Sequence, residues 1–136
     1  MIADTTFVSD LVRERRQDRR GPASALLAEL RAQSVRTTII TAGELAIMFE
    51  RSAEAFVWLA RWRIYPLHPG IAAAAADIDR VLRVRGARLG ENDNWIAGFA
   101  AYYREAIISH DEAFDRAPSV RRVQYVRPKK LLPAAS

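Results

Sequence analysis

Short apolar runs alternate along the chain with longer segments of helical periodicity, and this alternation limits the folds that the chain can adopt. Runs typical of buried strands cover residues 1–3, 35–41 and 107–108, and weaker strand patterns lie within 62–67 and 120–126. Helical spacing of apolar residues fills the intervals between them. Strands that alternate with helices favour a mainly parallel sheet covered by helices on both faces. We therefore expect a three-layer α/β/α domain.

The apolar spacing predicts five helices. Their patterns cover residues 7–12, 26–30, 45–61, 71–82 and 96–103, and the third should be the longest. Gly21 and Pro22 separate the first two patterns, so these helices should form a hairpin. Gly86 or Gly90 should end the fourth, and Gly98 lowers the helix propensity of the fifth. The residues expected to cap helix N-termini are Thr5 or Thr6, Thr41 and Asn92.

Length and composition set further limits. With 136 residues, half of them apolar, the chain is long enough for one compact domain, which we assign to residues 1–126. Residues 127–136 begin with Arg-Pro-Lys-Lys, and we expect them to form a mobile basic tail. The apolar stretch 71–76 is too short to cross a membrane, and no signal-peptide pattern is evident. These features predict a cytoplasmic protein without membrane attachment.

Four acidic residues stand where an apolar run stops or a helical pattern starts: Asp4, Glu44, Asp93 and Asp111. The carboxyl ends of the strands form the ligand crevice of an open α/β sheet, so these acids should lie close together. Clustered carboxylates repel one another unless a hard cation such as Mg²⁺ compensates their charge. The chain has no cysteine and only two histidines, so oxygen ligands must dominate. The alternative for any single acid is a solvated helix cap.

The charge balance suits a polyanionic substrate. The net charge is +5, and most of the positive charge is arginine, whose fork fits phosphate oxygens. A coding bias toward arginine and alanine would explain the same composition. Five arginines, at positions 13, 15, 16, 19 and 20, form a cluster. They can contact phosphate, form a solvated helix end or meet an acidic partner.

The four acids and their flanks resemble the PIN-domain nucleases, and within them the VapC-type toxins of type II toxin–antitoxin pairs. The resemblance covers almost the whole chain, with its pieces in the expected order. The pieces are Ile2-Ala3-Asp4-Thr5-Thr6, Thr41-Ala42-Gly43-Glu44-Leu45, Gly90-Glu91-Asn92-Asp93-Asn94-Trp95-Ile96-Ala97 and Ser109-His110-Asp111-Glu112-Ala113-Phe114. The third is the most specific, because it joins an acid at a helix start to the apolar face of that helix.

The resemblance implies a ribonuclease that uses Mg²⁺ or Mn²⁺. Asp4 and Asp93 would contact the metal directly, and Glu44 and Asp111 would hold its water or a second ion. Thr5 and Thr6, with Arg13, Arg15 and Arg16, are the candidate substrate contacts. Asp115, one helical turn after Asp111, could share the role of that acid. The resemblance further implies RNA as substrate, a cognate antitoxin protein as partner and a homodimer.

Two other functions fit parts of the sequence. A catalytically silent module of the same fold could use the basic surface to bind RNA or protein. A phosphoaspartyl enzyme or receiver domain fits less well, because Thr6 stands where an Asp-x-Asp motif needs its second acid. That class also needs a lysine, and none precedes Lys129.

Overall fold

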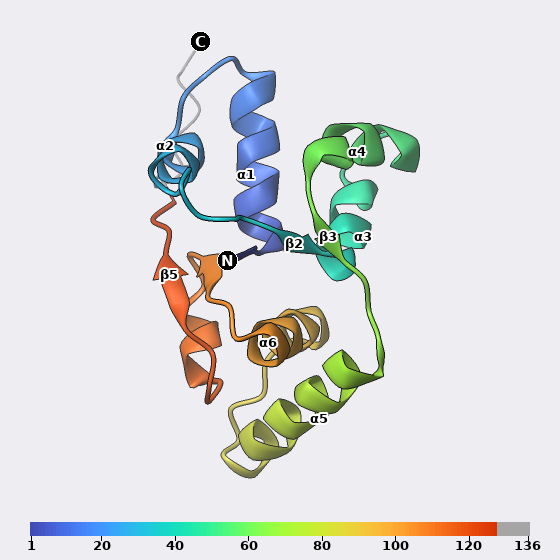
Figure 1. The fold of residues 1–136 in the computed structure, drawn as a ribbon, viewed down its shortest axis with the longest axis vertical. Coiled ribbons are helices and arrows are strands. Elements are labelled where there is room, and N and C mark those ends of the chain that lie inside the picture. The colour runs from blue at the N-terminus through green and yellow to red at the C-terminus, as the bar shows by residue number, and fades with distance from the viewer. Residues whose placement is uncertain (128–136) are drawn as a thin grey trace, which may run out of the picture.

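The computed structural model describes residues 1–127 and has a parallel sheet at its centre (Figure 1). Strands β1 (Ile2–Ala3), β4 (Ile107–Ser109) and β5 (Arg122–Gln124) pair in that order, all parallel. A second parallel pair joins β2 (Thr37–Thr38) to β3 (Ile64–Tyr65). A bridge between Ile2 and Arg36 connects the two sheets. The predicted parallel sheet is confirmed, and β5 is its predicted edge strand.

Six helices within residues 1–127 surround these strands. Their bounds are α1 (Thr5–Arg16), α2 (Pro22–Glu29), α3 (Ile39–Ile47), α4 (Ser52–Trp58), α5 (Pro69–Val84) and α6 (Glu91–Tyr103). Two short 3₁₀ helices, η1 (Leu59–Arg61) and η2 (Glu112–Arg116), complete the order. No helix in the part of the chain that the structure describes is long and apolar enough to span a bilayer.

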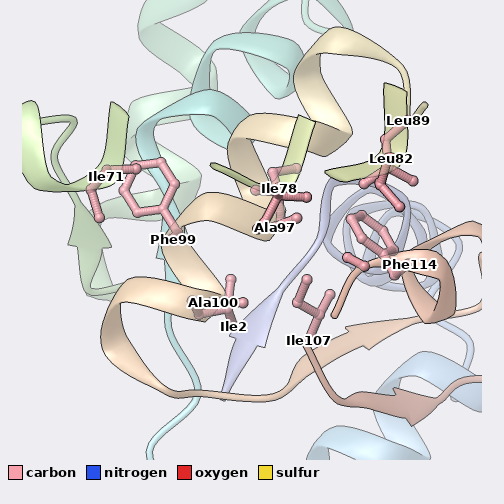
Figure 2. Packing of buried hydrophobic residues seen from close by; sticks show 12 residues of the cluster. Ile2, Ile71, Ile78, Leu82, Leu89, Ala97, Phe99, Ala100, Ile107 and Phe114 are labelled. Carbon is pink, nitrogen blue, oxygen red and sulfur yellow. The ribbon is translucent and has the colours of Figure 1, made fainter. Parts of the chain in front are cut away.

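Two hydrophobic cores lie on opposite faces of the sheet, because successive strand residues point to opposite sides. Ile2 and Ile107 belong to the core formed with α5 and α6, which Figure 2 shows around Phe99 and Phe114. Their neighbours Ala3 and Ile108 belong to the core formed with α1, α2 and α3. The predicted three-layer α/β/α fold is therefore confirmed.

Several sequence-based boundaries were wrong. The predicted strand 35–41 shortens to two residues, because the Thr38 side chain accepts a hydrogen bond from Thr41 N and starts α3 there. Thr41 is therefore not the cap. The long helix expected to end near residue 61 is divided into α3, α4 and η1, so α5 is the longest helix. Tertiary packing overrides propensity at this division, since no Gly or Pro marks it.

The remaining capping predictions also change. Asp4, rather than Thr5 or Thr6, caps α1, and its Oδ1 accepts a hydrogen bond from Phe7 N at 2.9 Å. Gly90 rather than Asn92 stands before α6 and makes no side-chain cap. Gly86, with a φ of 64°, follows the end of α5 as predicted.

The end of the described chain is fastened to α1. Asp10, although 6% exposed, accepts hydrogen bonds from the Tyr125 hydroxyl at 2.8 Å and from two nitrogens of Arg127. Arg13 adds a third donor group at 3.3 Å. These partners offset the cost of burying a carboxylate. Arg127 is thus part of the folded domain, while the rest of the predicted tail lies outside the described residues.

Close contact between α5 and α6 depends on Gly98. A Cβ at Gly98 would lie 2.7 Å from Ala75 Cβ and 3.0 Å from Ala75 N. The 2.7 Å separation between the two Cβ atoms is shorter than real contacts, and the rigid Ala75 backbone at 3.0 Å leaves little room to adjust, so the two helices would have to move apart. Gly98 therefore lowers the propensity of α6 but permits its close contact with α5.

We predict opposite effects for two Gly→Ala substitutions in helices. Gly98→Ala should lower the free energy of unfolding by about 1–2 kcal/mol, because overpacking exceeds the gain in helix propensity. Gly43→Ala is the control, since a Cβ there meets nothing within 4 Å. It should stabilise the protein by about 0.5–1 kcal/mol. Urea denaturation measures both, and equal stabilisation by the two variants would contradict the packing argument.

Candidate metal centre

The strand pairing at the centre of the sheet places two of the four acids at one edge. Asp4 follows β1, and Asp4 N donates a hydrogen bond to Ile108 O in β4 at 3.2 Å. Asp111 lies two residues after Ser109, the last residue of β4. Because β1 and β4 are parallel neighbours, both acids leave the sheet at its carboxyl edge.

Two helices supply the other acids. Glu44 lies in α3, which follows β2 directly, and Asp93 lies in the first turn of α6. All four carboxylates are close enough to interact, since Asp4, Glu44 and Asp111 each raise the pKa of Asp93 through their charge. These charge effects agree with the predicted grouping of the four acids, which we call the acid cluster.

Local hydrogen bonds orient three of the acids. Asp4 holds Phe7 N, and Asp111 Oδ1 accepts from Ala113 N at 2.9 Å. Both acids thus serve as helix caps as well as members of the cluster. Glu44 Oε1 accepts a hydrogen bond from the Thr5 hydroxyl at 2.6 Å, across the gap between α1 and α3.

Ser109 links two of the acids and was missed as a site residue in the sequence. Its Oγ accepts a hydrogen bond from Asp111 N at 2.9 Å, and its side chain also hydrogen-bonds Asp4. Ser109 is fully buried. The signal that could have identified it is a small hydroxyl residue at the end of an apolar strand, where a buried polar group needs partners.

Two of the four acids have raised pKa values, with burial as the largest cause in both. The pKa of Asp93 rises to about 6, mainly because burial disfavours its charge and secondarily because Asp111, Asp4 and Glu44 repel it. Burial also raises the pKa of Asp4, although hydrogen bonds from Ser109 and Phe7 oppose the change. The charge of His110 also lowers the pKa of Asp4.

The proposed substrate contacts occupy two different places. Thr5 and Thr6 lie in the first turn of α1 beside Asp4, but the Thr5 hydroxyl is bonded to Glu44. Arg13, Arg15 and Arg16 lie in the last turns of α1, so even Arg13 is about 14 Å along the helix from Asp4. Arg15 stacks over Trp58 and Arg16 over Phe49, with centroid distances of 5.5 and 4.4 Å. The helix thus separates these arginines from the acids.

Asp115 is engaged in an ion pair. Its two oxygens accept hydrogen bonds from Arg122 Nε at 3.0 Å and Nη2 at 2.9 Å, and the guanidinium holds the pKa of Asp115 below its usual range. Arg122 also donates to Ser109 O at 3.1 Å. Asp115 thus fastens η2 to β5, whereas Asp111 belongs to the charge cluster.

Comparison with known proteins agrees with this arrangement. The family model of the PIN domain matches residues 1–120. The chain belongs to the PIN-domain family. The family predicted from the sequence is therefore confirmed, whereas no curated protein matches this PIN domain.

Solved structures share the fold of this PIN domain. VapBC2 from Rickettsia felis, bound to a DNA fragment from its promoter, has a TM-score of 0.78 at 15% identity, covering 92% of this chain and 98% of that chain. DNA-bound VapBC from Salmonella typhimurium has a TM-score of 0.77 at 16% identity, with coverages of 92% and 97%. A toxin–antitoxin complex from Klebsiella pneumoniae has a TM-score of 0.66 at 19% identity, with coverages of 88% and 93%.

The donor set of the PIN domain fits a hard divalent cation. The cluster offers carboxylate oxygens only, and their mutual repulsion is a charge excess that a cation would relieve. Within residues 1–127, however, no three acidic or histidine side chains already stand in an arrangement that could hold a metal. Asp4, Asp111 and Glu44 instead accept hydrogen bonds from Phe7, Ala113 and Thr5. A cation would therefore have to draw the carboxylates together.

The raised pKa of Asp93 predicts how pH affects stability without metal. A carboxyl whose pKa is higher in the folded state binds protons more tightly there, so stability falls as pH rises from 3.8 to about 6. Asp93→Asn should remove this part of the slope. At pH 7 in chelator it should raise the free energy of unfolding by roughly 1–2 kcal/mol, allowing for its partial exposure.

Urea denaturation of the unsubstituted protein and of Asp93→Asn between pH 4 and pH 7 measures how the free energy of unfolding depends on pH. Asp77→Asn is the control, because Asp77 lies on the exposed face of α5 in a pair with Arg80. If Asp93→Asn and Asp77→Asn give the same pH profile, repulsion within the cluster does not reduce stability.

Proposed function

We propose that this PIN domain is a Mg²⁺- or Mn²⁺-dependent endoribonuclease and the toxin of a VapBC-type toxin–antitoxin pair. One observation supports the proposal: Asp4, Glu44 and Asp111 come from segments distant in sequence, yet each raises the pKa of Asp93 through its charge. PIN-domain toxins are generally nucleases, and the structures of similar fold are VapBC or toxin–antitoxin complexes. RNA as substrate and the cytoplasm as location belong to the same proposal.

The reaction is hydrolysis of a phosphodiester bond. Water adds to phosphorus, the bond to the 3′-oxygen breaks, and the leaving oxygen takes up a proton. Asp4 and Asp93 would hold the metal directly, with Glu44 and Asp111 completing the site. A bound divalent cation supplies charge neutralisation at the phosphate and lowers the pKa of water.

The surrounding residues of the chain hold these acids in place. Ser109 keeps Asp4 and Asp111 together at the ends of two adjacent strands, and Thr5 fixes Glu44. Once a cation had drawn the carboxylates together, these hydrogen bonds would limit further reorganisation of the acids during the reaction. No nucleophilic side chain is required, which agrees with a chain that has no cysteine.

We predict that Asp4→Asn and Asp93→Asn abolish metal-dependent RNA cleavage, with losses on the order of 100-fold or more. Each change removes a negative charge that the cation needs while conserving side-chain size. Cleavage of a single-stranded RNA in Mg²⁺ or Mn²⁺, with and without chelator, measures the effect. Asp77→Asn, outside the cluster, should cleave like the unsubstituted protein. Full cleavage by both cluster variants would refute the assignment.

A catalytically silent module is the second candidate, and one observation favours it. No three carboxylates or histidines in residues 1–127 already form a metal site. Such a module would bind RNA in a salt-dependent manner and leave it intact, because arginine contacts to phosphate suffice for binding. Cleavage that disappears with chelator supports the enzyme, and unchanged binding without any cleavage supports the module.

Exposed apolar side chains support a protein partner. Ile47 and Val57 are 85% and 76% exposed, and Met48 and Phe56 also lie in the exposed class. We call these four residues of the α3–α4 segment the α3–α4 apolar patch. Apolar side chains exposed together on a folded domain are typical of an interaction site. Arg15 and Arg16, stacked on Trp58 and Phe49, add positive charge beside the segment. We propose that the antitoxin covers this patch, and that the protein also forms a homodimer.

We predict that Val57→Asp weakens the complex with the cognate antitoxin by tenfold or more, because it places a charge within an apolar interface. Val84→Asp is the matched control, since Val84 is an equally exposed valine of α5, at 87%. Calorimetric titration of antitoxin measures both affinities, and sedimentation of the toxin alone tests the homodimer. Equal affinities for the two variants would exclude the α3–α4 apolar patch as the antitoxin site.

A further inference from the structure

We propose that Thr41 is a positioning residue of the acid cluster, which fixes the Glu44 carboxylate by directing the hydroxyl proton of Thr5. This inference rests on the proposed function, because it concerns an acid assigned to the metal. Thr41 lies outside the cluster itself, and it was expected from the sequence to be only a helix cap. The structure gives that cap to Thr38 and leaves the Thr41 hydroxyl available for another contact.

Three side chains form a chain of hydrogen bonds between α1 and α3. Thr5 Oγ1 lies 2.6 Å from Glu44 Oε1 and 3.1 Å from Thr41 Oγ1. A carboxylate only accepts hydrogen bonds, so the single hydroxyl proton of Thr5 points to Glu44. The second contact of Thr5 must then use its oxygen as acceptor, with Thr41 as the donor. The order of donation is therefore Thr41 to Thr5 to Glu44.

Burial of Thr41 explains why its hydroxyl donates to Thr5. Thr41 is 0% exposed, so its hydroxyl cannot exchange its partner for water and must bond within the protein. Its backbone is also fixed, because Thr41 N donates to Thr38 Oγ1 at 3.2 Å. The Thr41 hydroxyl is thus a donor at a fixed point in the core. Because Thr5 Oγ1 accepts from it, the Thr5 hydroxyl proton is left to point toward Glu44.

The consequence is a restrained Glu44. Its carboxylate repels Asp93, whose pKa it raises, and a half-buried glutamate is free to turn toward water. The hydrogen bond from Thr5 opposes that movement and keeps Glu44 beside the first turn of α1. Loss of the Thr41 hydroxyl would free the Thr5 hydroxyl to rotate, and the restraint on Glu44 would weaken.

The test compares three substitutions of buried threonines. Thr41→Val keeps the shape but removes the hydroxyl, and Thr41→Ser keeps the hydroxyl. Thr37→Val is the matched control, because Thr37 is also 0% exposed and its hydroxyl donates at 2.9 Å to a backbone oxygen, Ala3 O, and to none of the four acids. Mn²⁺ binding without RNA is measured by calorimetry. Unfolding by urea is measured in chelator.

Both valine variants should lose stability, but only Thr41→Val should weaken Mn²⁺ binding, by about tenfold, as expected for a residue that orients a metal ligand. Thr41→Ser should restore Mn²⁺ affinity to within about twofold of the unsubstituted protein. Equal Mn²⁺ affinities for Thr41→Val and Thr37→Val would reduce Thr41 to a structural residue and overturn the inference.

A metal-free measurement separates this inference from the proposed function. The folding equilibrium constant is compared with and without Thr41→Val, first in the unsubstituted protein and then in the Glu44→Ala variant. If Thr41 acts through Glu44, the factor by which Thr41→Val lowers this constant should be about threefold smaller in the Glu44→Ala variant. Thr37→Val should have the same effect in both backgrounds. Absence of Mn²⁺ binding by the unsubstituted protein would refute the metal centre, and the inferred role of Thr41 in metal binding with it. Equal effects of Thr41→Val in both backgrounds would refute the link from Thr41 to Glu44, whether or not metal binds.

Discussion

Parallel pairing of β1 with β4 is the contact on which the rest of the molecule depends. The register places Ile2 beside Ile107 and Ala3 beside Ile108, so each pair faces one of the two cores. The same register brings Asp4 and Ser109 to the same edge. If one strand slipped by one residue against the other, its core-facing side chains would turn to the opposite face and the alignment of the strand ends that carry the acids would be lost. The core and the acid cluster therefore rest on a single alignment of two short strands.

The fold holds together groups that repel one another. Asp93 and Asp4 both have raised pKa values, which means that the folded state is less favourable with all acids charged. Local hydrogen bonds offset part of this cost: Ser109 and Phe7 bind Asp4, and Thr5 binds Glu44. Gly98 contributes differently, because it lets α6, which carries Asp93, pack closely on α5. Groups with shifted pKa values, which reduce the stability of the folded protein, are common at functional sites.

Much of this arrangement could be predicted from the sequence because it follows from local patterns. Apolar runs located β1 and β4, and the acids after them indicated the shared edge. The division between α3 and α4 could not be predicted, since no Gly or Pro marks it. The cap was assigned to the wrong residue because Thr38 and Thr41 are equally suitable N-cap types. Spacing also could not show that the Thr5 hydroxyl bonds Glu44, or that α1 separates Arg13 from Asp4. Both depend on how separate helices and strands pack against one another, whereas the spacing of residues in one sequence indicates only local structure.

The acid cluster draws its members from nearly the full length of the folded domain, from Asp4 to Asp111. A ribosome makes the chain from its amino end, and β1 has no β4 to pair with until residues 107–109 have been made. Neither the sheet edge nor the cluster exists in shorter nascent chains. The order of synthesis thus delays assembly: a nascent chain that stops before residue 107 already carries Asp4, Glu44 and Asp93, but it lacks the strand and the fourth acid that complete the arrangement.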